Sequence, residues 1–160
     1  MRILIVSDTH RKNENYFALL KKWRDLDMVI HCGDVEGSEY ALSESAECPV
    51  CMVSGNNDFF SQLPREQEIN LGKYKVWITH GHNYLVSMGP ERIQQEARAR
   101  GVDIVIFGHT HRPLLLQDDD LITLNPGSLS YPRQEGHKPT YALMEIDKQG
   151  EAHFTLSHMR

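Results

Sequence analysis

The sequence is short of cysteine and has no long apolar run. Its cysteines, Cys32, Cys48 and Cys51, are odd in number, which argues against the disulfide framework of a small secreted protein. No stretch approaches the roughly 20 apolar residues that a membrane-spanning helix needs. The N-terminus, MRILIVSDTH, has one basic residue and an apolar stretch shorter than a secretory signal uses. We therefore expect a soluble, cytoplasmic protein.

Basic residues are too few and too scattered to bind an extended nucleic acid. Seventeen Lys and Arg stand against 22 Asp and Glu, so the net charge is −5, and no basic block is present. A local positive centre, such as a bound metal ion, could still attract a single phosphate. With 40% apolar residues among 160, the chain is long enough for one core, and we expect a single domain, residues 1–160.

Cys48 and Cys51 form a C-x-x-C pattern, which occurs in redox and zinc sites. A redox pair usually opens a helix, whose N-terminus lowers the pKa of the thiol, but the following residues, MVSG, have the pattern of a strand. A four-cysteine zinc site would need a second pair, and the sequence has none. We interpret both cysteines as core residues.

A short apolar segment followed at once by a polar turn recurs along the chain. Six segments have the pattern of a buried strand: RILIVS, DMVIHC, PVCMVS, YKVWIT, DIVIF and LITL. Helices are predicted at residues 14–24, 38–47 and 90–100. This alternation favours an α/β sheet with crossover connections. The tail, residues 140–147 and 151–159, has the pattern of two strands joined by a hairpin turn, which predicts antiparallel strands late in the chain.

Polar side chains stand where these strands end. Strand ends of an open α/β sheet gather at one rim and form its binding crevice. All of these side chains are carboxylates, carboxamides or imidazoles, and such mixed ligands suit Mn, Fe, Zn or Co better than Ca or Mg. Their number is too large for one transition-metal ion and fits two: Asp8, His10, Asp34, Asn56, His80, His109 and His111.

Each of these residues alone has an ordinary explanation. Asp8 or Asp34 could cap a helix, and Asn56 could hold a turn. We interpret His31 as a packing residue and Asp118–Asp120 as a hairpin tip rather than a calcium loop. Seven candidates in order at strand ends are harder to attribute to caps and turns. A two-metal site clamps the attacking and leaving oxygens of an in-line displacement, and phosphate-ester hydrolysis fits it.

The ordered motifs resemble those of calcineurin-like metallophosphoesterases, most closely the small bacterial and archaeal phosphodiesterase branch. The resemblance covers residues 1 to about 147 and implies an α/β fold, a four-layer α/β/β/α sandwich of two mixed β-sheets flanked by helices. The motifs that carry it are D-x-H at Asp8, G-D at Gly33, G-N at Gly55, H-G-H at His80, G-H-x-H at Gly108 and N-P-G-S at Asn125.

This resemblance also implies a dinuclear metal-dependent phosphodiesterase. One metal ion would be held by Asp8, His10 and His111, and the other by Asn56, His80 and His109. Asp34 would bridge them together with a hydroxide, which attacks the phosphate ester in line. Members of the family commonly use Mn, and sometimes Fe, Ni, Co or Zn. The substrate would be a small phosphodiester or nucleotide-like molecule.

One position departs from the family pattern. Many members carry a histidine after the motif asparagine that is proposed to protonate the leaving group, and this chain has Asn57 there. A carboxamide cannot deliver a proton. The proton could come instead from solvent or His82, or the leaving group could contact a metal ion directly. We expect His82 to act in catalysis with Asp34 and Asn56, or to orient His80 or touch the phosphate. Candidate substrate contacts are Asn57, Arg11, Arg112, Ser128 and Arg133.

Two other functions stay open. A phosphomonoesterase or nucleotidase could use the same site, and the retromer subunit of similar fold is mainly a scaffold for protein partners that keeps much of this pattern. The complete ligand set favours the enzyme, because loss of one ligand damages catalysis more than folding. Apolar strands in the tail could also form a homodimer.

Overall fold

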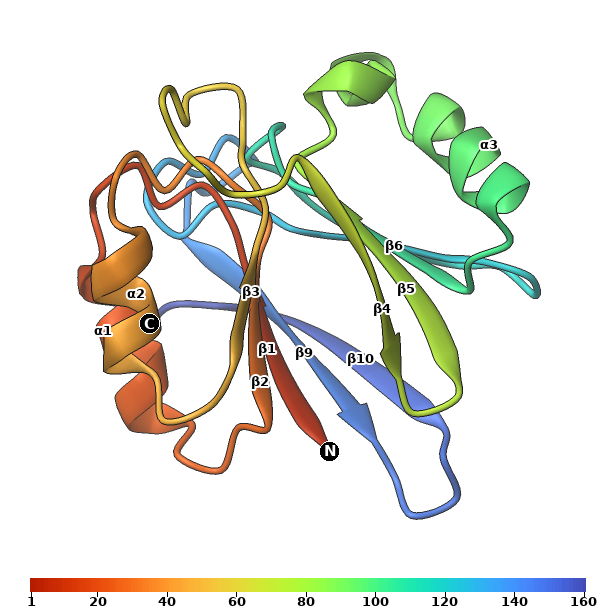
Figure 1. Cartoon of the computed structure of the whole chain (residues 1–160), viewed down its shortest axis with the longest axis horizontal. Coiled ribbons are helices and arrows are strands. Elements are labelled where there is room, and N and C mark those ends of the chain that lie inside the picture. The colour runs from red at the N-terminus through yellow and green to blue at the C-terminus, as the bar shows by residue number, and fades with distance from the viewer.

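Two five-stranded sheets packed face to face form the centre of the protein in a computed structural model that describes residues 1–160 (Figure 1). The first sheet has the order β10-β9-β1-β2-β3, with β1 (Arg2–Val6), β2 (Met28–His31), β3 (Val50–Met52), β9 (Thr140–Ile146) and β10 (Ala152–His158). The second has the order β4-β5-β6-β8-β7, with β4 (Glu66–Leu71), β5 (Tyr74–Thr79), β6 (Ile104–Ile106), β7 (Pro113–Gln117) and β8 (Ile122–Pro126).

Helices cover the outer face of each sheet, which confirms the predicted four-layer α/β/β/α sandwich. Two lie on the first sheet, α1 (Glu14–Lys22) and α2 (Glu39–Ser45), and one on the second, α3 (Glu91–Arg100). All three lie where the sequence predicted them, and their ends agree with the prediction or fall one to two residues short of it. No helix of the chain is both long and apolar enough to span a bilayer.

Both sheets are mixed, as expected. β1, β2 and β3 pair in parallel, as do β5, β6 and β8, whereas β9 pairs antiparallel with β1 and β10. The predicted tail hairpin is thus confirmed. Asp118–Asp120 lies in the turn between the antiparallel strands β7 and β8, which confirms the hairpin tip.

The sequence patterns missed β4 and β7 and two short 3₁₀ helices, η1 (His82–Tyr84) and η2 (Val86–Met88). The strands are at the two edges of the second sheet, where fewer side chains are buried and the apolar signal is weak. Pro113 begins β7, and an edge position tolerates its missing backbone N–H.

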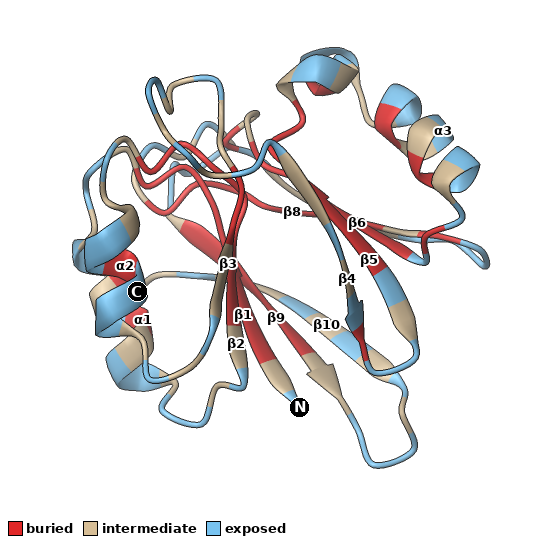
Figure 2. Cartoon of the chain, in the orientation of Figure 1, coloured by how far each residue is buried: buried red, intermediate tan, exposed pale blue.

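Apolar side chains fill the three spaces between the four layers. Figure 2 shows buried residues along the central strands of both sheets. Because both faces of the central strands are covered, these strands are apolar without interruption. Between the sheets, Ile3 and Ile5 of β1 lie in one cluster with Ile104 and Ile106 of β6. The other two spaces are filled by helix residues packed on the outward faces of the strands, including Tyr16, Leu19, Leu42, Ile93 and Ala97.

The cysteines are core residues, as interpreted. All three are free, Cys32 and Cys51 pack in the cluster between the sheets, and Cys48 packs under the helices. Burial raises the pKa of the Cys51 thiol to about 11, so it stays protonated and unreactive at neutral pH.

His31 is also a packing residue. Its ring is fully buried, Nδ1 accepts the Gly33 N–H at 3.1 Å, and Nε2 bonds Thr9 Oγ1 at 3.0 Å. Both ring nitrogens are therefore satisfied within the protein. Burial lowers the pKa of His31 from its ordinary value of 6.5 to about 4, although the nearby Asp8 charge acts in the opposite direction.

The buried neutral His31 predicts a pH-dependent loss of stability. Between pH 6.5 and pH 4 the unfolded chain binds a proton here that the folded chain does not, so stability falls as pH falls through this window. Across this window the free energy of unfolding should fall by about 3 kcal/mol because of His31. Urea denaturation of wild type and His31→Gln with a chelator present should show a flatter pH dependence for the variant. Parallel curves would contradict this account.

Candidate metal centre

The loops that follow the parallel strands of both sheets meet at one edge of the sandwich, the upper edge in Figure 1. The first sheet contributes side chains after β1, β2 and β3, and the second contributes them after β5 and β6. This rim brings together the residues predicted as metal ligands: Asp8, His10, Asp34, Asn56, His80, His109 and His111.

One tight group of potential ligands consists of Asp8, His10 and His111, whose ligand atoms all lie within 4.8 Å of one another. Asp8 Oδ1 is 3.2 Å from His111 Nε2 and 3.7 Å from His10 Nε2. The two imidazole nitrogens are 3.2 Å apart. These three residues are the set that the resemblance assigns to one metal ion.

A second tight group consists of Asp8, Asp34 and His80. His80 Nε2 lies 3.4 Å from Asp34 Oδ2 and 3.8 Å from Asp8 Oδ1. Asp8 is thus common to both groups. Asp34 Oδ2 also lies 3.7 Å from His10 Nε2, so this carboxylate is close to a histidine of each group.

Asn56 and His109 lie beside the second group but outside it. Asn56 Oδ1 accepts a hydrogen bond from His109 Nδ1 at 3.0 Å, and the ring of His109 is 5.2 Å from that of His80 between centroids. Asn56 is exposed and His109 half-buried. This part of the rim is more open than the part around Asp8.

Three histidines are held so that Nε2 faces inward. His80 donates Nδ1–H to the Cys32 carbonyl and His111 donates Nδ1–H to the Tyr131 carbonyl, both at 2.7 Å. His10 Nδ1 lies 3.2 Å from a carboxylate oxygen of Glu36. An oxygen acceptor at Nδ1 leaves the Nε2 lone pair free, which is the form that binds a metal ion.

Two buried atoms at the centre of the site have no hydrogen-bond partner: Asp8 Oδ1 and His80 Nε2. They belong to the same group of ligands and face each other. A buried polar atom without a partner is costly, and a metal ion would satisfy both at once. The residues present therefore fit the metal ions that the fold family uses, because a carboxylate and an imidazole are typical ligands for them.

Both carboxylates are ionised at neutral pH. Burial alone would raise the pKa of Asp8, but the imidazoles of His10, His111 and His80, whose Nε2 atoms lie 3.7, 3.2 and 3.8 Å from Oδ1, hold it well below its ordinary range. Burial also opposes ionisation of Asp34, but the nearby His80 imidazole, 3.4 Å away, and two hydrogen bonds from Asn57 lower its pKa to about 2. The two acids are in the state that binds cations.

Neighbouring carboxylates that are ionised raise the pKa of His10. Burial lowers its pKa, but Asp8 and Glu36 outweigh burial and raise the pKa to about 9. His10 must therefore lose a proton before its Nε2 can act as a ligand.

Most of the predicted ligands have a left-handed backbone, which is unfavourable for residues other than glycine. Their φ angles are 54° at Asp8, 46° at His10, 60° at Asp34, 69° at His109 and 57° at His111. Backbone hydrogen bonds between the first two strand ends hold two of them, since Asp8 N–H donates to Gly33 O and His10 N–H to Asp34 O. Such strain is typical of functional sites, at about 1–3 kcal/mol per residue.

Asp58 and Glu36 support the site and were not singled out from the sequence. The Asp58 carboxylate accepts the backbone N–H groups of Asp34, Glu36 and Gly55, each at 2.7 Å. This fixes the loop after β2 against the loop after β3. The only sequence signal was their position, two residues after the motif residues Asp34 and Asn56.

Asn57 holds Asp34 from the same side. Its backbone N–H donates to Asp34 Oδ1 and its side-chain amide to Asp34 Oδ2, both at 2.9 Å. The residue that replaces the family histidine is thus already bonded to the carboxylate between the two groups.

The remaining candidates differ in exposure. Arg11, Arg112 and Arg133 are exposed near the rim, and Arg11 Nε donates to the Glu36 carbonyl at 2.8 Å. Ser128 is fully buried, and its hydroxyl is used by the Asp8 carbonyl and two backbone N–H groups. Its hydroxyl therefore holds the backbone of Asp8, and a contact of Ser128 with substrate stays a prediction.

His82 is half-buried beside the second group, with its ring 5.5 Å from that of His80 and 6.0 Å from that of His109. Burial, followed by the charge of His80, lowers the pKa of His82. The imidazole is therefore neutral at pH 7, and its buried Nδ1 has no hydrogen-bond partner.

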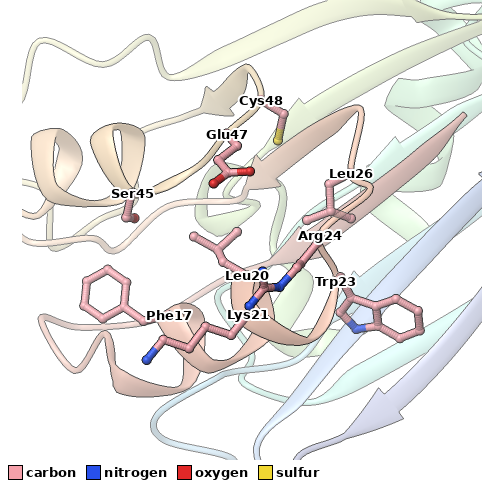
Figure 3. Close-up of a pocket in the computed structure, with 9 residues that line it drawn as sticks. All are labelled: Phe17, Leu20, Lys21, Trp23, Arg24, Leu26, Ser45, Glu47 and Cys48. Carbon is pink, nitrogen blue, oxygen red and sulfur yellow. The ribbon is translucent and has the colours of Figure 1, made fainter.

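A hollow of about 460 Å³ lies away from these residues (Figure 3). It is lined by the C-terminal half of α1, by Leu26 before β2 and by Cys48 before β3. It is therefore at the amino ends of these strands, opposite the rim. None of the predicted ligands reaches it.

Comparison with known proteins agrees with this geometry. A family described as "Calcineurin-like phosphoesterase superfamily domain" matches residues 1–149. A probable metallophosphoesterase of Methanocaldococcus jannaschii is 34% identical, over 83% of this chain and 70% of the relative. A protein of the same archaeon named as a phosphodiesterase is 28% identical, over 79% of this chain and 83% of the relative. The crystal structure of a predicted phosphoesterase from Streptococcus pneumoniae has a TM-score of 0.80 at 26% identity, covering 98% of this chain and 97% of the other.

Gly55 provides a test of the support around Asp34. A Cβ here would lie 2.6 Å from the Asp34 backbone nitrogen and closer still to its Oδ1, so Gly55→Ala must displace the carboxylate. We expect Mn²⁺ and Zn²⁺ to bind about 10–100-fold more weakly, measured by isothermal titration calorimetry. The control is Ser54→Ala, since no hydrogen bond involves that side chain. Unchanged affinity in Gly55→Ala would contradict the role given to this contact.

Proposed function

Since the chain belongs to the calcineurin-like phosphoesterase superfamily, we propose that it is a metal-dependent phosphodiesterase that works with two divalent ions, most often Mn²⁺. The observation that carries the proposal is a pair of buried atoms that could bind a metal ion, Asp8 Oδ1 and His80 Nε2. They lie 3.8 Å apart and have no hydrogen-bond partner, and the carboxylates of Asp8 and Asp34 are ionised. The relative named as a phosphodiesterase supports a diester substrate.

In this proposal Asp8, His10 and His111 would hold one ion, Asn56, His80 and His109 the other, and Asp34 both. Fe, Ni, Co or Zn could replace Mn at such a set of ligands. When bound, two such ions supply positive charge for the phosphate oxygens and lower the pKa of water toward 7.

The chain's own residues would prepare and hold the reactants. Asp34 is kept ionised and oriented by Asn57 and Asp58, and the histidines present Nε2 because their Nδ1 atoms are engaged. Arg11, Arg112 and Arg133 would contact nonbridging phosphate oxygens, for which guanidinium groups are suited. In the overall reaction the oxygen of water bonds to phosphorus, one ester P–O bond breaks, and the leaving alcohol takes up a proton.

No residue is well placed to give that proton. The Asn57 amide bonds Asp34 and has no acidic proton, and His82 is neutral at pH 7 because its pKa is lowered. The leaving group must then depart with little help from the protein. Esters of acidic alcohols and phenols should therefore react best.

Phosphodiester hydrolysis tests the function directly. We expect bis-p-nitrophenyl phosphate to be cleaved with Mn²⁺ and cleaved faster than the monoester p-nitrophenyl phosphate. Asp34→Ala should lose at least about 100-fold in kcat/KM, because both ions would lose a ligand. A panel of Mn²⁺, Fe²⁺, Ni²⁺, Co²⁺ and Zn²⁺ with release of p-nitrophenolate measures this. Absence of turnover with every ion would favour a scaffold that only binds metal, and preferential monoester cleavage would favour a phosphomonoesterase.

The missing proton donor makes a separate prediction. Wild type should cleave methyl p-nitrophenyl phosphate at least about 100-fold faster than methyl phenyl phosphate, because a general acid is worth 10²–10⁴-fold and matters most for the poorer leaving group. Asn57→His should narrow this ratio, and Asn57→Ala, which removes the amide without adding an acid, should not. Equal rates for the two substrates in wild type would refute the idea that the protein lacks an effective donor.

A further inference from the structure

The strand β10 lies at an open edge of the first sheet. It pairs with β9 on one side only, and the two strands form the tail hairpin (Figure 1). The other sheet edges are β3, β4 and β7. An unpaired edge strand is a template to which another strand can add, so proteins usually protect edges by short length, charged side chains or proline.

Each of the other three edges has such protection. β3 has only three residues, β4 carries Glu66 and Glu68, and β7 begins with Pro113. β10 has seven residues, Ala152–His158, and among them is no Asp, Glu, Lys, Arg, Pro or Gly. All seven pair with β9 in one unbroken register, so no bulge twists the edge away. β10 is thus a long edge that nothing protects.

The hydrogen bonds of the hairpin determine which backbone groups of β10 point outward. At the two ends of the hairpin, Asp147 N–H donates to Glu151 O, and Met159 N–H donates to Pro139 O. Bonded and non-bonded residues alternate along each side of an antiparallel pair. The odd-numbered residues of β10 therefore bond β9, and the backbone groups of the even-numbered residues point away from it.

The outward-pointing residues are Ala152, Phe154, Leu156 and His158. The Ala152 N–H leaves the hairpin as this pattern requires, and it donates to the Tyr74 hydroxyl at 3.0 Å. No hydrogen bond of the protein reaches the backbone of Phe154 or Leu156 from the outer side. The middle of the edge thus offers N–H and C=O groups at the spacing that an antiparallel strand needs.

The side chains of β10 lie on two faces of different character. Phe154 and Leu156 are half-buried against the apolar layer between the sheets. His153 and Thr155 are exposed on the opposite face. A strand that pairs well with β10 must therefore be apolar on one face and polar on the other.

A second copy of β10 meets this requirement. When two copies run antiparallel with Thr155 opposite Thr155, all seven residues of each strand are paired. Phe154 then lies opposite Leu156, and His153 lies opposite Ser157, so apolar side chains meet apolar ones and polar side chains meet polar ones without like charges. In this register Phe154 and Leu156 exchange backbone hydrogen bonds across the contact.

From these observations we propose that β10 joins two copies of the chain into a homodimer, in which the first sheets are continuous across a twofold axis at Thr155. The interface is isologous, with the same strand on both sides. An axis normal to the sheet reverses the strand direction, so the metal centres lie at opposite ends of the dimer and both stay open. The pairing needs no metal ion, and the inference is independent of the proposed catalytic function.

A cysteine at the axis tests the register. In the dimer the two Thr155 residues form a non-hydrogen-bonded pair with Cα atoms about 4.5 Å apart, within the range of roughly 4.4–6.8 Å that a disulfide spans. Thr155→Cys should therefore give a disulfide-linked dimer under mild oxidation with a chelator present, measured by non-reducing electrophoresis. Wild type measures any cross-linking through the native cysteines.

His153→Cys is the matched control, because His153 is also exposed on the same face of β10. Its two copies would be about 13 Å apart, since each lies two residues from the axis, so it should cross-link at least about tenfold more slowly. A mixture of His153→Cys and Ser157→Cys should cross-link, because these two positions lie opposite each other. Equal rates for His153→Cys and Thr155→Cys would overturn the register.

Thr155→Lys tests the dimer in solution, because it places two like charges directly opposite each other at the axis. The exposed side chain leaves the fold of the monomer unchanged, which circular dichroism checks. In sedimentation velocity wild type should form a dimer, and Thr155→Lys but not Thr155→Ser should raise the dissociation constant at least about fivefold. A wild type that sediments as a monomer at about 1 mM, or a dimer equally strong in Thr155→Lys, would overturn the assignment of β10.

Discussion

The structure depends on two carboxylates, Asp8 and Asp34, that are ionised in a place where water is largely excluded. Burial opposes the charge of each, and the surrounding histidines, together with Asn57 at Asp34, keep their pKa values low. Even so, Asp8 Oδ1 and His80 Nε2 have no partner in the chain. An interior that holds negative charge and leaves it incompletely compensated is arranged for a cation, and most features of the rim follow from this requirement.

The packing of the two sheets determines where that cation site can exist. Asp8, Asp34 and Asn56 follow strands of the first sheet, whereas His80, His109 and His111 follow strands of the second. Neither sheet alone carries both carboxylates and enough imidazoles. The apolar layer between β1 and β6 sets the spacing of the sheets and so brings the two halves of the ligand set within reach of each other.

The patterns of the sequence predicted the layers and the ligand candidates because both have local signals. Continuous apolar strands ending in Asp, Asn or His, the helix predicted at residues 14–24, and the tail hairpin are all visible in short windows. Edge strands β4 and β7 were missed because their half-exposed residues carry little periodicity. Asp58 and Glu36 were missed because their contacts join loops far apart in the chain. Left-handed backbone at Asp8 or His109 has only a weak signature in residue type, because Asp and His adopt it more often than most residues but usually do not.

That left-handed backbone has an evolutionary consequence. A glycine or asparagine would fit the backbone better at five of the ligand positions: Asp8, His10, Asp34, His109 and His111. Selection for stability alone would therefore replace residues of the rim and leave the two-sheet sandwich unchanged. A related protein that does not need the metal centre could therefore replace these ligands without losing stability, and it would keep the two-sheet sandwich. The complete ligand set in this chain therefore stands at positions where the backbone gives up stability for the placement of side chains.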